Sequence, residues 1–291
     1  MLTDYIPKNL ILKRSFYMKA VNKLSILLVG SVMLLAALTP AIGIPTVSMA
    51  PRIHLDGLNN SQAYSTNWSG YAVTASKNAV TKVQGSWTVP KVTGTSTAYS
   101  SFWVGIDGFN SATVEQIGTD SDISGGRPVY YAWFEFYPSS MYQITSLSVL
   151  PGDVMSASVT YSGSDRGSFG RTSSVFTVTI TDGRTGKSFT TSGTVSNAAM
   201  SSAEWIAEAP SSYRGVLPLS NFGTVNYGKD YTSVTGTCYA TISGVNGQIS
   251  SFGTAVQQIT MVTNKGVTKA SPTALSSDGT SFSVTWANAG P

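Results

Sequence analysis

From Trp68 onward, apolar and polar residues alternate with a period of two, and the three-to-four-residue spacing of helices is nearly absent. In residues 82–88, for example, Val83 and Trp87 alternate with polar residues up to Pro90. Successive side chains of a strand point to opposite faces, so this pattern predicts half-buried strands. The same alternation predicts strands at residues 155–161, 176–180, 187–191, 203–208, 237–242, 256–262 and 281–286.

These many short strands, together with 28 glycines and abundant Ser and Thr, predict an all-β fold. An antiparallel sandwich or jelly roll fits best. No break in composition follows Ser65, so residues 67–291 are expected to form one domain. Residues 197–202 are expected to form one short helical turn.

The N-terminal region has the pattern of a secretory signal. Basic residues up to Lys23 precede an apolar run at residues 24–38, and small residues around Pro40 follow. Residues 1–43 are therefore predicted to be a signal peptide, with Met18 as an alternative start, and the protein is predicted to be secreted. An uncleaved membrane anchor is the rival interpretation. Residues 44–66 are expected to be a linker or a short pro-segment.

The formal net charge of +4 and the pI near 9.0 come from this N-terminal region. Beyond residue 52 the chain has 12 Lys and Arg against 13 Asp and Glu, a net charge of −1. No basic patch is dense enough to indicate nucleic-acid binding.

Cys238 and His54 are the only cysteine and the only histidine. The chain therefore cannot form an internal disulfide or a zinc site of His and Cys, and a Ser-His-Asp or Cys-His site would need His54. A hydrolase of this composition is expected to work with carboxylates, amides and hydroxyls, without a metal or cofactor.

Three polar residues among apolar ones are candidates for chemistry. Glu204 shares a strand face with Ile206 and Glu208, although a solvated face is the commoner explanation for such a Glu. Glu135 shares a face with aromatic residues, which indicates either core packing or an aromatic-lined cleft. The amide of Gln116 offers both a donor and an acceptor, as a group that stabilises an oxyanion or orients a water requires.

Six motifs resemble, in order and approximate spacing, those of the glutamic peptidases, the eqolisin family. They are NWSGY at residues 67–71, WTVP at 87–90, FWVGIDG at 102–108, QIGTD at 116–120, AWFEFYP at 132–138 and AEWI at 203–206. The resemblance spans roughly residues 67–231.

This resemblance implies a lectin-like β-sandwich of two large antiparallel sheets and an endopeptidase that acts on proteins or peptides at acidic pH. The catalytic Gln and Glu of the family fall on Gln116 and Glu204. The substrate-binding residues fall on Trp68, Trp103, Asp107, Asp120, Glu135 and Tyr137. Glu204 would act as general base on a water and then as general acid, and Gln116 would stabilise the oxyanion. The two side chains should face each other across one concave sheet surface. A monomer is expected.

The chain departs from the family pattern in several places. Tyr131 stands where an acidic residue is frequent, and Glu115 where an apolar residue is usual; alternation predicts that Glu115 faces away from Gln116, outward. Disulfides and a long pro-segment are missing. These departures suggest a prokaryotic branch of the family.

Two other hypotheses use the same residues. A retaining glycosidase on a lectin-like sandwich would need Glu135 and Glu204 about 5 Å apart. A non-catalytic carbohydrate-binding module would use the aromatic side chains alone.

Overall fold

The computed structural model describes residues 53–59, 61–166 and 171–290. The predicted signal peptide and the first part of the predicted linker lie outside these ranges. Within them, no helix is both long enough and apolar enough to cross a membrane.

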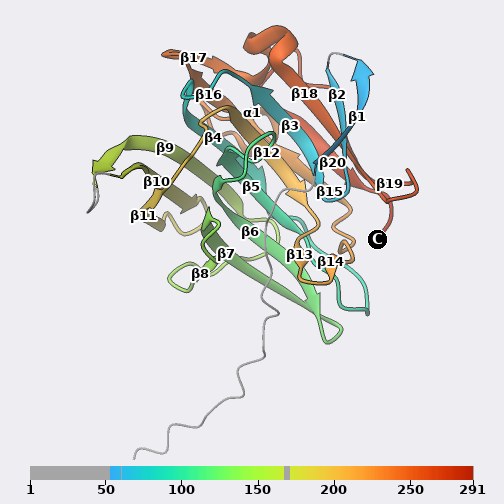
Figure 1. Ribbon diagram of the computed structural model, residues 1–291. Coiled ribbons are helices and arrows are strands. Elements are labelled where there is room, and N and C mark those ends of the chain that lie inside the picture. The colour runs from blue at the N-terminus through green and yellow to red at the C-terminus, as the bar shows by residue number, and fades with distance from the viewer. Residues whose placement is uncertain (1–52, 60, 167–170, 291) are drawn as a thin grey trace, which may run out of the picture. The chain divides into compact units, whose positions relative to one another are not determined.

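One sheet has the strand order β8–β7–β6–β5–β12–β3–β18–β2–β1 (Figure 1). Its neighbouring strands are antiparallel except β2 and β18, which are parallel. The strands are β1 Ile53–Asn59, β2 Gln62–Ser65, β3 Trp68–Thr74, β5 Ser101–Ile106, β6 Val114–Ser124, β7 Arg127–Tyr137, β8 Tyr142–Ile144, β12 Ser202–Glu208 and β18 Val256–Val262.

The second sheet is built on β4, which pairs with β9 along its length and with β15 and β16 on its other side. It continues through β10 to β11 in one direction and through β20 to β19 in the other, and β19 also pairs with β18 of the first sheet. The strands are β4 Val80–Thr88, β9 Val154–Arg166, β10 Thr172–Asp182, β11 Ser188–Val195, β15 Thr224–Tyr227, β16 Tyr239–Ile242, β17 Val245–Gln248, β19 Thr268–Pro272 and β20 Phe282–Trp286.

The predicted antiparallel two-sheet sandwich is confirmed, and each predicted strand lies within or overlaps an observed one. Among the described residues, the elements outside the two sheets are short: a hairpin of β13 Ser211–Ser212 and β14 Gly215–Val216, the one-turn helix α1 Lys229–Thr232 and the 3₁₀ segment η2 Ile249–Ala255.

Two local expectations were wrong. The stretch at 44–66, expected to be a linker or a short pro-segment without strands, contains β1 and β2, which join the first sheet. Residues 197–202 form no helical turn, because backbone N–H groups of this stretch donate to the side chain of Asp107.

Alternation along the first sheet divides its side chains between two hydrophobic clusters. The main core includes Val104, Ile117 and Trp205 together with residues of the second sheet such as Val159 and Val178. A smaller cluster lies on the opposite face of the first sheet and contains Trp68, Trp103, Trp133, Ile206 and Val114. We call this second face the outer face.

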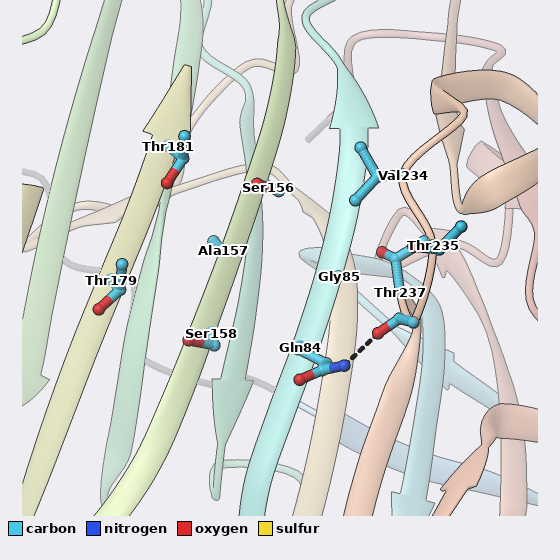
Figure 2. Close-up of a pocket in the computed structure, with 11 residues that line it drawn as sticks. Gln84, Gly85, Ser156, Ala157, Ser158, Thr179, Thr181, Val234, Thr235 and Thr237 are labelled. Carbon is cyan, nitrogen blue, oxygen red and sulfur yellow. Dashed lines mark hydrogen bonds between the residues drawn. The ribbon is translucent and has the colours of Figure 1, made fainter. Parts of the chain in front are cut away.

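Hydroxyl groups cover the opposite face of the second sheet. Figure 2 shows Ser156 and Ser158 of β9 beside Thr179 and Thr181 of β10, at a cavity of about 250 Å³. Neighbouring strands here are linked by hydroxyl pairs, such as Thr177 with Ser162 at 2.7 Å and with Ser192 at 2.9 Å. This face therefore relies on contacts that do not change with pH.

Gly70 allows β3 to approach β12 closely. It has a φ of 144°, and a Cβ placed on it would lie 2.2 Å from the carbonyl oxygen of Trp205. Gly94 has a similar φ of 138° but no atom within 4 Å of such a Cβ.

We expect Gly70→Ala to destabilise the fold more than Gly94→Ala. Both substitutions place an alanine in an unfavourable backbone region, at about 1–3 kcal/mol, and Gly70→Ala adds overpacking of about 1–3 kcal/mol. The free energy of unfolding in urea measures both variants. Equal losses would contradict the role given to the contact with Trp205.

Candidate active site

The register of four neighbouring strands, β12, β5, β6 and β7, sets polar and aromatic residues in three rows across the outer face. The first row is Glu204, Gly105, Gln116 and Glu135. The second is Ile206, Trp103, Gly118 and Trp133, and the third is Glu208, Ser101, Asp120 and Tyr131. Directly paired residues of antiparallel strands share a face, so these twelve residues belong to one surface.

Gln116 contacts Glu135, its partner on β7. The amide Nε2 donates a hydrogen bond of 2.7 Å to Oε2 of Glu135. Both side chains are buried, and burial raises the pKa of Glu135 to about 8, partly offset by this hydrogen bond. The Gln116 amide is thus held in one orientation, with a second N–H still available.

Glu208, at the end of β12, accepts two hydrogen bonds on this face. Nδ2 of Asn67 donates to Oε1 at 3.0 Å, and Nε1 of Trp103 donates to Oε2 at 2.8 Å. The indole N–H of Trp68 lies beside the same carboxyl group without completing a hydrogen bond of normal geometry. Burial raises the pKa of Glu208 well above its usual value, these donors oppose the shift, and the charge of Glu135 adds to it.

Glu204 lies in a different environment. Gly105 separates it from Gln116, so their Cα atoms are about 10 Å apart, two strand spacings. A Cβ on Gly105 would be 2.9 Å from Cζ3 of Trp103, so the indole ring lies over this gap. Burial raises the pKa of Glu204 well above its usual value, and the nearby charges of Asp107 and Glu115 add to the shift.

Glu115 itself is fully buried, so the expectation that it faces outward was wrong. Burial raises its pKa, and the charge of Asp107 raises it further. Neither carboxyl oxygen of Glu115 or of Glu204 has a hydrogen-bond partner of normal geometry among the described residues. Burial therefore favours the neutral forms of both carboxyl groups.

Asp107 holds a loop in place. Its carboxylate accepts the backbone N–H groups of Ala199 and Met200, each at 2.7 Å, and of Ser201 at 2.9 Å. These bonds explain why residues 197–202 do not form a helical turn. The carboxylate predicted to bind substrate is thus already engaged by three backbone donors.

Asp120 belongs to a pair of acids that the sequence analysis did not identify. The hydroxyl of Tyr131 donates to Oδ2 of Asp120 at 2.7 Å and lies 3.3 Å from Oδ2 of Asp122. Burial raises the pKa of Asp120 to about 6. Burial and the charge of Asp120 raise that of Asp122 well above its usual value. Tyr131, noted as a departure from the family pattern, bridges the two acids.

Aromatic rings enclose the carboxyl groups. The rings of Trp68 and Trp103 meet edge to face with centroids 5.0 Å apart, and both are fully buried. Tyr137 is partly buried and packs at the border of this cluster with Met141 and Leu217. Of the predicted substrate-binding residues, Trp68, Trp103, Asp120 and Glu135 lie together near Glu208, and Tyr137 lies at the border.

Asn67, Asp122 and Glu208 were not among the predicted site residues. For Glu208 the signal was present, because its two-residue spacing from Ile206 and Glu204 indicates a shared face. The glycosidase hypothesis, which pairs Glu135 with Glu204, is not favoured: Glu135 contacts Gln116 at 2.7 Å, and the charges that act on Glu204 are those of Asp107 and Glu115.

The chain is similar to known peptidases. It is 29% identical over 199 residues to aspergillopepsin-2 from Aspergillus niger, which covers 60% of this chain and 66% of that protein. It is 33% identical over 104 residues to scytalidopepsin B from Scytalidium lignicola, which covers 35% of this chain and 38% of that protein. The alignments therefore span less than two thirds of each relative.

Solved structures share the fold. Scytalido-glutamic peptidase with a transition state analog inhibitor superposes with a TM-score of 0.60 at 23% identity, covering 76% of this chain and 98% of that one. SCP-B of the eqolisin family, in complex with the tripeptide Ala-Ile-His, gives 0.58 at 21% identity with the same coverage. The family model described as the Peptidase A4 family matches residues 66–283. The chain therefore belongs to the Peptidase A4 family.

Proposed function

We propose that this protein is a secreted endopeptidase that hydrolyses peptide bonds at acidic pH, with Glu208 as general acid and base and Gln116 as oxyanion stabiliser. Membership of the Peptidase A4 family supports the peptidase activity. The N-terminal sequence pattern supports secretion. The substrates would be proteins or peptides, as the inhibitor and tripeptide complexes of the similar structures suggest.

The choice of Glu208 over Glu204 rests on Glu135. This residue contacts Gln116 at 2.7 Å and is close enough to Glu208 for its charge to raise the pKa of Glu208. The pKa of Glu204 is instead raised by the charges of Asp107 and Glu115, in addition to burial. Gln116, Glu135 and Glu208 thus form one group, and the pairing of Gln116 with Glu204 expected from the sequence is replaced in this proposal.

The reaction follows from these groups. Ionised Glu208, favoured by the N–H donors of Asn67 and Trp103 once water and substrate enter the site, takes a proton from a water. The hydroxide attacks the peptide carbonyl carbon, and the free N–H of the Gln116 amide donates to the developing oxyanion. Glu208 then returns its proton to the leaving nitrogen as the C–N bond breaks. Glu135 is a positioning residue that holds the amide of Gln116.

We expect Glu208→Gln and Gln116→Ala each to lower kcat for a denatured protein substrate at about pH 4 by roughly 100-fold or more. Glu204→Gln is the matched control on the same strand and should keep at least about a tenth of the activity. Near-UV circular dichroism checks that each variant is folded.

The reverse result, with Glu204→Gln inactive and Glu208→Gln active, would restore the pairing expected from the sequence. Activity in Gln116→Ala would contradict the oxyanion role.

The buried carboxyl groups also predict how stability depends on pH. A carboxyl whose pKa is higher in the folded state than in the unfolded state stabilises the fold at low pH. This stability is lost as pH rises from the unfolded value, about 4, through the folded value. For Asp120 and Glu135 the folded values are about 6 and about 8.

We therefore expect the free energy of unfolding to fall between about pH 4 and pH 8, by on the order of 3 kcal/mol from Asp120 alone. Urea unfolding at several pH values measures the slope. Glu135→Gln should flatten it above about pH 5, because the amide cannot ionise. A stability that is constant or rises over this range would refute the expectation.

A further inference from the structure

Lys269 is a buried cation with no carboxylate partner among the residues that the structure describes. It lies on β19 and is 1% exposed. Its ammonium Nζ donates to the backbone carbonyl of Thr66 at 3.3 Å. Burial lowers its pKa to about 8, so the group remains charged at acidic and neutral pH.

Elsewhere in the described chain, a cation that forms ion pairs contacts carboxylates directly. The ion pairs found there belong to Arg184, which contacts Asp153 at 2.5 Å and Asp182 at 3.5 Å. Removing a charge from water is costly unless the charge is paired and hydrogen-bonded. Among the described residues the ammonium of Lys269 makes one long hydrogen bond, to a neutral carbonyl, so its charge is incompletely compensated there.

Lys269 lines a cavity of about 320 Å³. Arg214, from the turn between β13 and β14, lines the same cavity, and Thr66, Thr263 and Asn264 add polar groups. The described residues that line it include two cations and no Asp or Glu. The Arg214 guanidinium is oriented by Tyr213, whose hydroxyl accepts from Nε at 2.7 Å and whose ring lies 5.2 Å below.

This cavity adjoins the proposed active site. Thr66 precedes Asn67, whose side chain donates to Glu208 at 3.0 Å. Leu217, just after β14, packs against the tryptophan cluster of the outer face. The covalent path through Asn67 limits the separation of Lys269 Nζ and Glu208 Oε1 to roughly 13 Å, about four residues of extended peptide.

We propose that this cavity is a subsite for a carboxylate of the peptide substrate, bound between Lys269 and Arg214. The carboxylate would come from an acidic side chain within about four residues of the scissile bond or from the peptide C-terminus. An ammonium and a guanidinium together match the charge and the planar geometry of a carboxylate. The inference rests on the peptidase function proposed above.

Matched peptides test the subsite. The set holds a neutral peptide with Gln and a C-terminal amide, the same peptide with Glu at each position within four residues of the cleaved bond, and the neutral sequence with a free C-terminus. At about pH 5, at least one charged peptide should have a kcat/KM roughly 10-fold above the neutral peptide. Which peptide is cleaved faster shows whether the cavity binds an acidic side chain or the peptide C-terminus. The preference for a Glu peptide should decline below about pH 4, because its side chain is then protonated.

Lys269→Met and Arg214→Gln should each lower this preference at least about threefold. Lys265→Met removes an exposed lysine from the same β18–β19 hairpin, outside the cavity, and should leave the preference unchanged. Arg214 is exposed, so its variant remains informative if Lys269→Met does not fold. Equal kcat/KM for charged and neutral peptides, or a preference kept in both cavity variants, overturns the subsite.

A binding measurement tests the subsite independently of the proposed peptidase activity. The dissociation constants of the same peptides, labelled with a fluorophore, are measured by fluorescence anisotropy on Glu208→Gln. Tighter binding of a charged peptide, lost in the Lys269→Met double variant, supports the subsite even if no peptide is cleaved by the wild type. Equal binding of charged and neutral peptides, or no binding of either, overturns it whatever the cleavage result.

Discussion

Carboxyl groups buried beside indole rings are the physical constraint on which both the stability and the chemistry of this protein depend. Burial penalises the charged form, so the pKa values of Asp120, Glu135 and Glu208 are all raised. In acid Asp120 and Glu135 are neutral and the outer face can remain packed. At higher pH the same groups acquire charge in an apolar setting. The proposed activity in acid and the expected stability in acid thus share one cause.

Hydrogen-bond donors oppose the effect of burial on the pKa of Glu208. Asn67 and Trp103 both hydrogen-bond its carboxyl oxygens, and these bonds favour the ionised form. Glu204 has no comparable partner of normal geometry among the described residues. Two glutamates four residues apart on one strand therefore differ in what they can do. The difference comes from the neighbouring strands and not from the residues themselves.

Local alternation predicted the strands and their faces because a two-residue period is a property of the chain itself. It correctly grouped Glu204 with Glu208 on one face. It could not decide between them, because that choice depends on side chains from other strands: Glu135, which holds the amide of Gln116, acts on Glu208, whereas Asp107 and Glu115 act on Glu204. The last of the six motifs, AEWI, ends at Ile206, two residues before Glu208. Cross-strand register is a non-local property that no single segment encodes.

The surroundings of Asp107 and the burial of Glu115 were not predicted, for a related reason. Alternation predicted an outward Glu115 on the assumption that one face of the sheet meets water, whereas this face lies in the packed interior of the sandwich. The role of Asp107 depends on a loop nearly a hundred residues away, at residues 199–201, whose backbone N–H groups donate hydrogen bonds to its carboxylate. Neither contact is visible from the neighbouring sequence.

Acid conditions also restrict which interactions can hold the rest of the fold together. Ion pairs weaken when carboxylates are protonated. In the described part of the chain, the ion pairs all involve Arg184. Hydroxyl pairs such as those of Thr177 carry no charge and persist in acid. The contact of Lys269 is also independent of pH. Its hydrogen-bond acceptor is the backbone carbonyl of Thr66, which accepts at any pH, whereas a carboxylate partner would be neutralised in acid. A cation held in this way keeps its charge in acid, as the proposed carboxylate subsite requires.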